Sequence, residues 1–168
     1  MKKICAFYAS DYHFEMISLP YIEENLEKRK EIIILTENDL QDTIKTLISN
    51  INIEEKKKQS LEQINWKNDD LNKFKKIKKD TEENKDVIIF IKGKENYIRN
   101  INKNIEKWTS KNNKVKIVDC YDMSEVSEKV DTLMEKYKIM LGTAGEKVIE
   151  NIYIIIYKKG CYFYKNDI

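Results

Sequence analysis

The stretch ICAFYASDYHFE, residues 4–15, places an apolar, β-prone run directly before a polar cluster that contains no glycine. Three later runs also end abruptly in polar residues and lead into segments with helical spacing. The four apolar runs are Ile4–Ala9, Glu31–Leu35, Val87–Ile91 and Val115–Val118. Strands that alternate with helices predict an α/β fold with a mainly parallel sheet in three layers, because the helices cover both faces.

Length and composition favour one soluble globular domain over residues 1–168. The chain is long enough for one domain with its own core and too short for two ordinary domains with a linker. Hydrophobic residues make up 41% and charged residues 36%, which is not the composition of a disordered chain. The net charge of +2 predicts no long-range attraction to nucleic acid or to an anionic membrane.

The cysteines and the N-terminus favour a cytoplasmic location. Cysteines 5, 120 and 161 are too few and too scattered for a disulfide framework or a zinc site, which is typical of a reducing compartment. The first apolar run meets Asp11 before it reaches the length of a signal peptide. No run approaches the roughly 18 apolar residues of a spanning helix, so we expect no membrane partner.

Several helix and strand boundaries can be predicted from local signals. Pro20 should kink the first helix or mark its start, and the second helix should begin at Thr36 or Asn38. Ser124 is expected to cap the helix that follows the fourth run. Gly142 and Gly145 should bracket a turn. A closing hairpin of 152–157 and 161–164 is expected to add an antiparallel edge to the sheet.

The segment from about 52 to 85 is a charged helical insertion. It contains one expected helix over Glu54–Ile64, and then a mobile, partly helical connection to Asp86. One interpretation is a solvated cover over one edge of the sheet, as is usual for charge runs. The other is a nucleic-acid surface over residues 56–79 in which Trp66 and Phe74 stack on bases, although acidic residues interrupt it.

Polar residues at the ends of the four runs are the candidate ligand site. Ligands of open parallel sheets bind at the carboxyl ends of the strands, so we predict that these residues share one rim. They are Ser10, Asp11, His13, Thr36, Glu37, Lys92, Lys94, Asp119 and Asp122. Tyr8, Tyr12 and Tyr121 would supply an apolar wall. The alternative is that these groups cap helices and pair with one another without leaving a cavity.

The motifs of several enzyme classes are missing from the sequence. The first turn has no glycine, so it cannot cradle a triphosphate as a P-loop does. The chain also lacks a dinucleotide fingerprint, a nucleophile elbow and a second histidine for a metal site. We therefore expect no catalytic residues, no metal and no cofactor. A small hydrolase or transferase that uses His13 with Asp11 or Asp119 is a further alternative.

Both ends of the chain resemble the MEDS sensory domain, a module of methanogen and methylotroph proteins and of a dichloromethane-responsive regulator. KICAFY (3–8) resembles its first strand, and LPYIEENL (19–26) with EIII (31–34) resembles its first helix and second strand. DCYD (119–122), IMLG (139–142) and NIY (151–153) resemble its closing segment. The chain departs from the family at Lys3, where a histidine is expected, and at Ile152, where a proline is expected.

The resemblance implies a Rossmann-like sheet of the RecA or KaiC type that has lost its nucleotide loop. A protein of this family senses or signals and does not hydrolyse nucleotides. The function that follows is a non-catalytic sensory or regulatory domain for a small-molecule ligand or a signalling partner. These 168 residues contain no helix-turn-helix or kinase sequence, so we expect any signal to pass to a separate protein.

Overall fold

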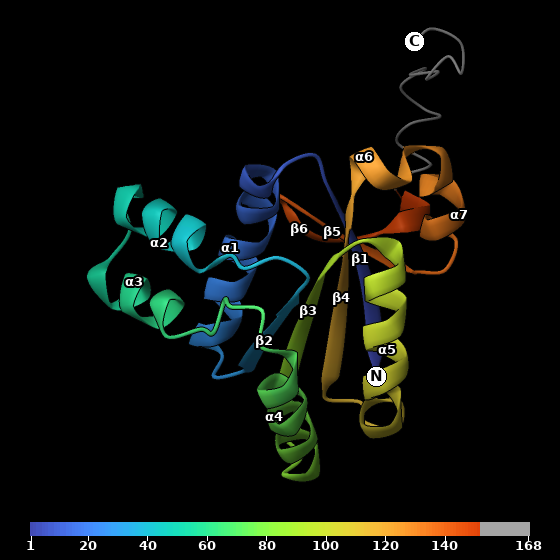
Figure 1. The fold of residues 1–168 in the computed structure, drawn as a ribbon, viewed down its shortest axis with the longest axis horizontal. Helices are drawn as coiled ribbons and strands as arrows, with labels where there is room; N and C mark the ends of the chain where they lie inside the picture. The colour runs from blue at the N-terminus through green and yellow to red at the C-terminus, as the bar shows by residue number, and fades with distance from the viewer. Residues whose placement is uncertain (152–168) are drawn as a thin grey trace, which may run out of the picture.

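The computed structural model describes residues 1–151, in which six strands form one sheet in the order β2-β3-β4-β1-β5-β6 (Figure 1). The strands are β1 (Lys2–Tyr8), β2 (Glu31–Thr36), β3 (Val87–Gly93), β4 (Val115–Asp122), β5 (Ile139–Gly142) and β6 (Gly145–Val148). Every neighbouring pair from β2 to β5 is parallel, and β5 with β6 is antiparallel. The predicted α/β fold with a mainly parallel sheet is confirmed.

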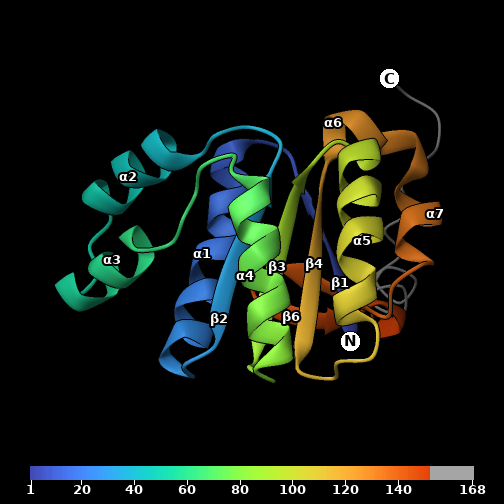
Figure 2. The same cartoon turned by 60° about the horizontal axis from the view of Figure 1, so that its bottom comes forward.

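Helices cover both faces of this sheet and complete the three layers (Figure 2). On one face lie α1 (Asp11–Glu27), α2 (Gln41–Asn50) and α3 (Glu55–Glu62). On the other lie α4 (Asp70–Glu82), α5 (Glu95–Thr109), α6 (Met123–Val126), the 3-10 turn η1 (Ser127–Lys129) and α7 (Val130–Met134). The expected single helix after the fourth run is thus broken into three short pieces.

The central strands are apolar on both sides because helices cover both sides. Along β3, Ile88 and Phe90 belong to the core under α1, whereas Ile89 and Ile91 belong to the core under α5. This alternation follows from the two-residue period of a strand. It explains why the central parallel strands appear in the sequence as continuous β-branched runs.

Helix α1 passes through Pro20 without ending there. It begins at Asp11, and the Ser10 side chain caps it by accepting the N–H of His13. The prediction that Pro20 marks its start is therefore wrong. Helix α2 begins at Gln41, later than the predicted Thr36 or Asn38, because Thr36 still belongs to β2 and Asp39 binds the N–H of Gln41.

The insertion contains a second full helix that the sequence did not predict. In place of a mobile connection, α4 runs for 13 residues and packs against β2 and α5. Its buried face carries Ile77 with the polar residues Lys73 and Asp80. A buried face with so few apolar residues explains why periodicity alone missed this helix.

Strands β5 and β6 give the sheet an antiparallel edge within the described residues. Strands β5 and β6 form a hairpin in which Gly142 pairs with Gly145, so the predicted turn joins two strands. Gly145 adopts a φ of 86°, a conformation that favours glycine. The hairpin predicted over 152–164 lies outside the described residues.

Candidate functional site

A buried lysine joins the end of β3 to the first turn of α1. Lys92 is 4% exposed, and its ammonium donates a 2.8 Å hydrogen bond to the Asp11 carboxylate. The same ammonium lies 4.7 Å from the centre of the Tyr8 ring and 5.4 Å from that of Phe14. Ring faces attract a cation, so these three groups together hold Lys92 in place.

Glu15 lies one turn further along α1 and is almost fully buried. Its Oε1 atom has no hydrogen-bond partner among the described residues. Burial raises the pKa of Glu15, and the nearby Asp11 raises it further, whereas Lys92 lowers it. This carboxyl group was not among the predicted site residues, although it follows Asp11 by one helical turn.

The remaining predicted residues of the first turn are bound to nearby backbone. Ser10 accepts the N–H of His13 at 3.1 Å, and the Nδ1 atom of His13 accepts the N–H of Ala9 at 3.1 Å. The only histidine of the chain thus takes part in the turn that starts α1.

The residues that follow β2, β3 and β4 are also paired locally. Thr36 donates to the carbonyl of Asn38 at 2.6 Å, and Glu37 accepts the N–H of Lys94 at 2.9 Å. Asp122 accepts the N–H of Ser124 at 2.9 Å, so Asp122 caps α6 in place of the predicted Ser124. These contacts match the alternative in which rim residues cap helices and pair with one another.

Asp119 lies on the opposite face of the sheet from Lys92 and His13. It sits within β4, under α5, and accepts hydrogen bonds from Asn102 at 2.8 Å and from Tyr137 at 2.6 Å. Burial raises the pKa of Asp119, although the two hydrogen bonds and Lys3 lower it. The nine predicted residues therefore do not converge on one rim, because the strand continues through Asp119 and alternation turns that side chain away.

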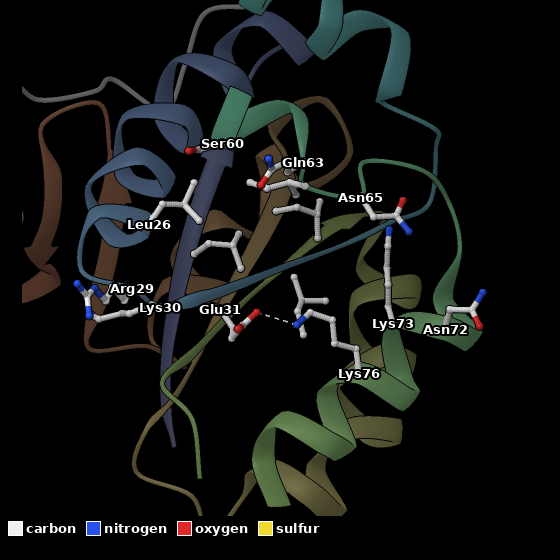
Figure 3. Close-up of a pocket in the computed structure, with 14 residues that line it drawn as sticks. Leu26, Arg29, Lys30, Glu31, Ser60, Gln63, Asn65, Asn72, Lys73 and Lys76 are labelled. Atoms are coloured by element: carbon white, nitrogen blue, oxygen red, sulfur yellow. Dashed lines mark hydrogen bonds and ion pairs between the residues drawn. The ribbon is translucent and has the colours of Figure 1, made fainter. Parts of the chain in front are cut away.

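A pocket of about 620 Å³ opens beside the edge strand β2 (Figure 3). We call it the edge pocket. It is lined by residues of α1, the α1–β2 turn, β2, α3, the α3–α4 connection and α4. They are Leu26, Arg29, Lys30, Glu31, Ile32, Ile33, Ile34, Ser60, Gln63, Ile64, Asn65, Asn72, Lys73 and Lys76. Its volume falls within the roughly 300–1,000 Å³ of small-molecule sites.

Polar groups stand around an apolar middle in the edge pocket. Figure 3 shows Arg29 and Lys30 at one end and Lys73 with Asn65 at the other. Four isoleucines also line the pocket. The ammonium of Lys76 lies 2.7 Å from Glu31 and 2.7 Å from Asp80, so two carboxylates balance its charge. Sequence reasoning missed this pocket because its residues come from six separate segments.

Lys73 is a buried charge of the edge pocket that, over residues 1–151, has no acid within ion-pair distance. It is 4% exposed, and its ammonium donates to the carbonyl oxygen of Lys67. Among the described residues, no carboxylate lies within 4 Å of it. Burial lowers the pKa of Lys73, while Asp70, Asp69 and Asp39 raise it from a greater distance. A buried cation without an acid beside it is costly, so it indicates a group that anions can approach.

The aromatic residues proposed for nucleic-acid stacking are packed inside the protein. Trp66 has no exposed surface, and its indole N–H donates to the carbonyl of Leu61 at 3.0 Å. Phe74 is partly buried and packs against Trp108, with 6.4 Å between ring centres. Neither ring is free to stack on a base in this arrangement.

Metal and membrane signals can be tested over residues 1–151. Within this range, no three His, Cys, Asp or Glu side chains gather so that they could hold a metal ion. None of the helices found there combines the length and the apolar character needed to cross a bilayer.

Comparisons of the chain with protein-family models, with curated proteins and with solved structures give no match. The resemblance to the MEDS domain stays a prediction from the sequence.

Proposed function

We propose that this protein is a non-catalytic sensory or regulatory domain of the cytoplasm that binds a small anionic molecule in the edge pocket. The observation that carries the proposal is Lys73, a lysine that lines the pocket, is 4% exposed and has no carboxylate within 4 Å among the described residues. An anion beside its ammonium would relieve the cost of burying that charge.

The amide groups around Lys73 support an anionic ligand. Asn65, Asn72 and Gln63 line the same pocket, and the side-chain amide of each carries N–H donors. A carboxylate or phosphate oxygen accepts hydrogen bonds from such donors. The pocket thus offers one buried cation and several neutral donors.

The state of the reactive side chains supports a non-catalytic role. Burial raises the pKa of the Cys5 thiol to about 12 and raises that of Cys120 well above its usual value. Both thiols stay protonated near neutral pH, whereas the thiolate is the nucleophile. His13, the base of the enzymatic alternative, lies on the opposite face of the sheet from Asp119.

The signalling part of the proposal rests on the resemblance of the chain ends to the MEDS domain. On this proposal, ligand binding alters a surface that a separate signalling protein binds. The edge pocket suits this role because its walls belong to α1, α3 and α4, which approach the same sheet edge from different sides. Nucleic-acid binding by residues 56–79 remains the weaker alternative because Trp66 is buried.

The proposal is tested by thermal unfolding with millimolar phosphate, succinate or octanoate at matched ionic strength. An anion at 100 times its dissociation constant should stabilise the wild-type protein by about 2.7 kcal/mol. The Lys73→Met variant should lose this gain, whereas Lys75→Met, which alters an exposed lysine of the same helix, should keep it. If no anion stabilises the wild type, or if both variants respond equally, the edge pocket is not an anion site.

A further inference from the structure

We infer that the ligand of the edge pocket is an amphipathic carboxylate, with its single negative charge at Lys73 and its apolar body over the isoleucines of the pocket floor. This inference rests on the proposed anion site and adds the chemical class of the ligand. The nearest polar neighbour of the head group would be Asn65, which Figure 3 shows beside the Lys73 side chain.

The charges at this end of the pocket suit one negative charge better than two. Lys73 and Lys76 are the lysines that line the wall formed by α4. Lys76 already binds both Glu31 and Asp80 at 2.7 Å, and Asp80 is 2% exposed. Lys73 therefore supplies the one uncompensated positive charge there. A phosphate dianion would leave a second negative charge unbalanced in a partly buried place.

The middle of the pocket suits an apolar group. Leu26 from α1, Ile32 from β2 and Ile64 after α3 line it, and all three belong to or pack against the core between α1 and the sheet. Small-molecule sites combine such an apolar wall with a few fixed polar groups. A ligand without an apolar body would gain nothing from this wall.

The difference between Arg29 and Lys73 sets the orientation of the ligand in the pocket. Its side chain is exposed at the end opposite Lys73, so water screens its charge. A screened cation binds a carboxylate weakly, whereas the enclosed Lys73 holds it in a less polar setting. The head group of the ligand therefore belongs at Lys73, and its apolar tail extends towards Leu26.

The inference is tested by calorimetric titration with butyrate, hexanoate and octanoate, beside 1-octanol, succinate and inorganic phosphate. Each added methylene should tighten carboxylate binding by about fourfold, since a buried methylene contributes about 0.8 kcal/mol. Lys73→Met should weaken octanoate binding by about tenfold or more and leave 1-octanol unchanged, while Lys75→Met should change neither. Leu26→Gln should flatten the dependence on chain length without removing the preference for a charged head.

The possible results separate the two proposals. Binding of phosphate or succinate through Lys73 without any gain from chain length would overturn the amphipathic ligand and keep the anion site. Equal affinity for octanoate and 1-octanol would also overturn it. Absence of binding by every anion, with the protein folded by circular dichroism, would overturn both. Failure of Lys73→Met to fold would be recognised by the same spectrum. The dependence of carboxylate affinity on chain length in the Leu26→Gln variant would then test the amphipathic ligand: an unchanged dependence would overturn it.

Discussion

The ammonium of Lys92 donates a hydrogen bond of 2.8 Å to the carboxylate of Asp11, a residue 81 positions earlier in the chain. The lysine is buried at the end of β3, while the aspartate is half exposed on the first turn of α1. This contact fixes one end of α1 over the sheet. The pair is therefore a structural link whose strength depends mainly on the cost of leaving Lys92 without an acid.

Substitution of Asp11 tests that link. Asp11→Asn should lower the free energy of unfolding by about 1–2 kcal/mol, less than for a fully buried pair, because water reaches Asp11. The matched control is Asp42→Asn, which removes an acid from the first turn of α2 with no ion pair among the described residues. Urea unfolding that gives equal losses for both variants would show that the effect is one of helix ends alone.

Trp66 should be a major contributor to stability. Trp66→Ala should cost about 3–5 kcal/mol, because it removes a large, fully buried side chain from the core that joins α3 to the sheet. Trp66→Phe should cost less, since it keeps part of the volume and loses the hydrogen bond to Leu61. Chemical denaturation measures both variants, and a loss below about 1 kcal/mol for the alanine variant would mean that Trp66 is not packed in this way.

The Glu146 carboxyl should make stability fall in acid. Burial raises its pKa, but hydrogen bonds from Lys116, Lys2 and Tyr21 outweigh that effect and lower the pKa to about 2. The ordinary value is 4.5, so this contribution is present above pH 4.5 and is lost as the pH falls towards 2. It amounts to at most about 3 kcal/mol.

The Glu146→Gln variant isolates this effect. Its stability at neutral pH should be lower, and the difference from the wild type should shrink between pH 4.5 and 2. Glu128→Gln, at an exposed glutamate, serves as the control. A difference that stays constant over this range would show that Glu146 does not titrate with a lowered pKa.

Asp119 should show the opposite dependence on pH. Burial raises its pKa above 3.8, so its protonated form favours the folded state, and stability falls as the pH rises from 3.8 through the folded pKa. Asp119→Asn should therefore be neutral or stabilising at pH 7. The amide also offers a donor to the Oδ1 atom of Asn102, which has no partner among the described residues.

The tyrosine that binds Asp119 provides a second measurement. Tyr137→Phe should cost about 1.5–3 kcal/mol at a pH above the folded-state pKa of Asp119, since it then removes a hydrogen bond of 2.6 Å to a buried carboxylate. In the Asp119→Asn background, the cost should fall to about 0.5–1.5 kcal/mol because the acceptor is neutral. Tyr12→Phe, at an exposed tyrosine, should cost little. Equal costs in both backgrounds at that pH would contradict an ionised acceptor.

The parallel strands could be predicted because strands that are buried on both faces have continuous apolar sequences. Runs such as Val87–Ile91 are apolar at every position, which a strand needs when helices cover both of its faces. Strands β5 and β6 could not be found in this way. Each has four residues, and Glu146 and Lys147 give the second one no apolar pattern.

The candidate site was harder to predict than the fold. Sequence showed that Asp119 follows an apolar run, but not that the strand continues to Asp122 and turns Asp119 to the other face. Lys73 stands in a segment crowded with lysines, and no local pattern distinguishes the buried one from Lys75 or Lys78. Only the packing of α4 against the edge strand makes that difference.

The most direct test of the central claim is the location of the bound anion. Titration of the ¹⁵N-labelled protein with octanoate, followed by amide chemical shifts, reports this location residue by residue. The edge pocket predicts the largest shifts at residues 30–34, 63–65 and 72–76, and their loss in the Lys73→Met variant. Shifts centred on Ser10, His13, Glu37 and Lys94 would place the ligand at the strand ends and would contradict the claim.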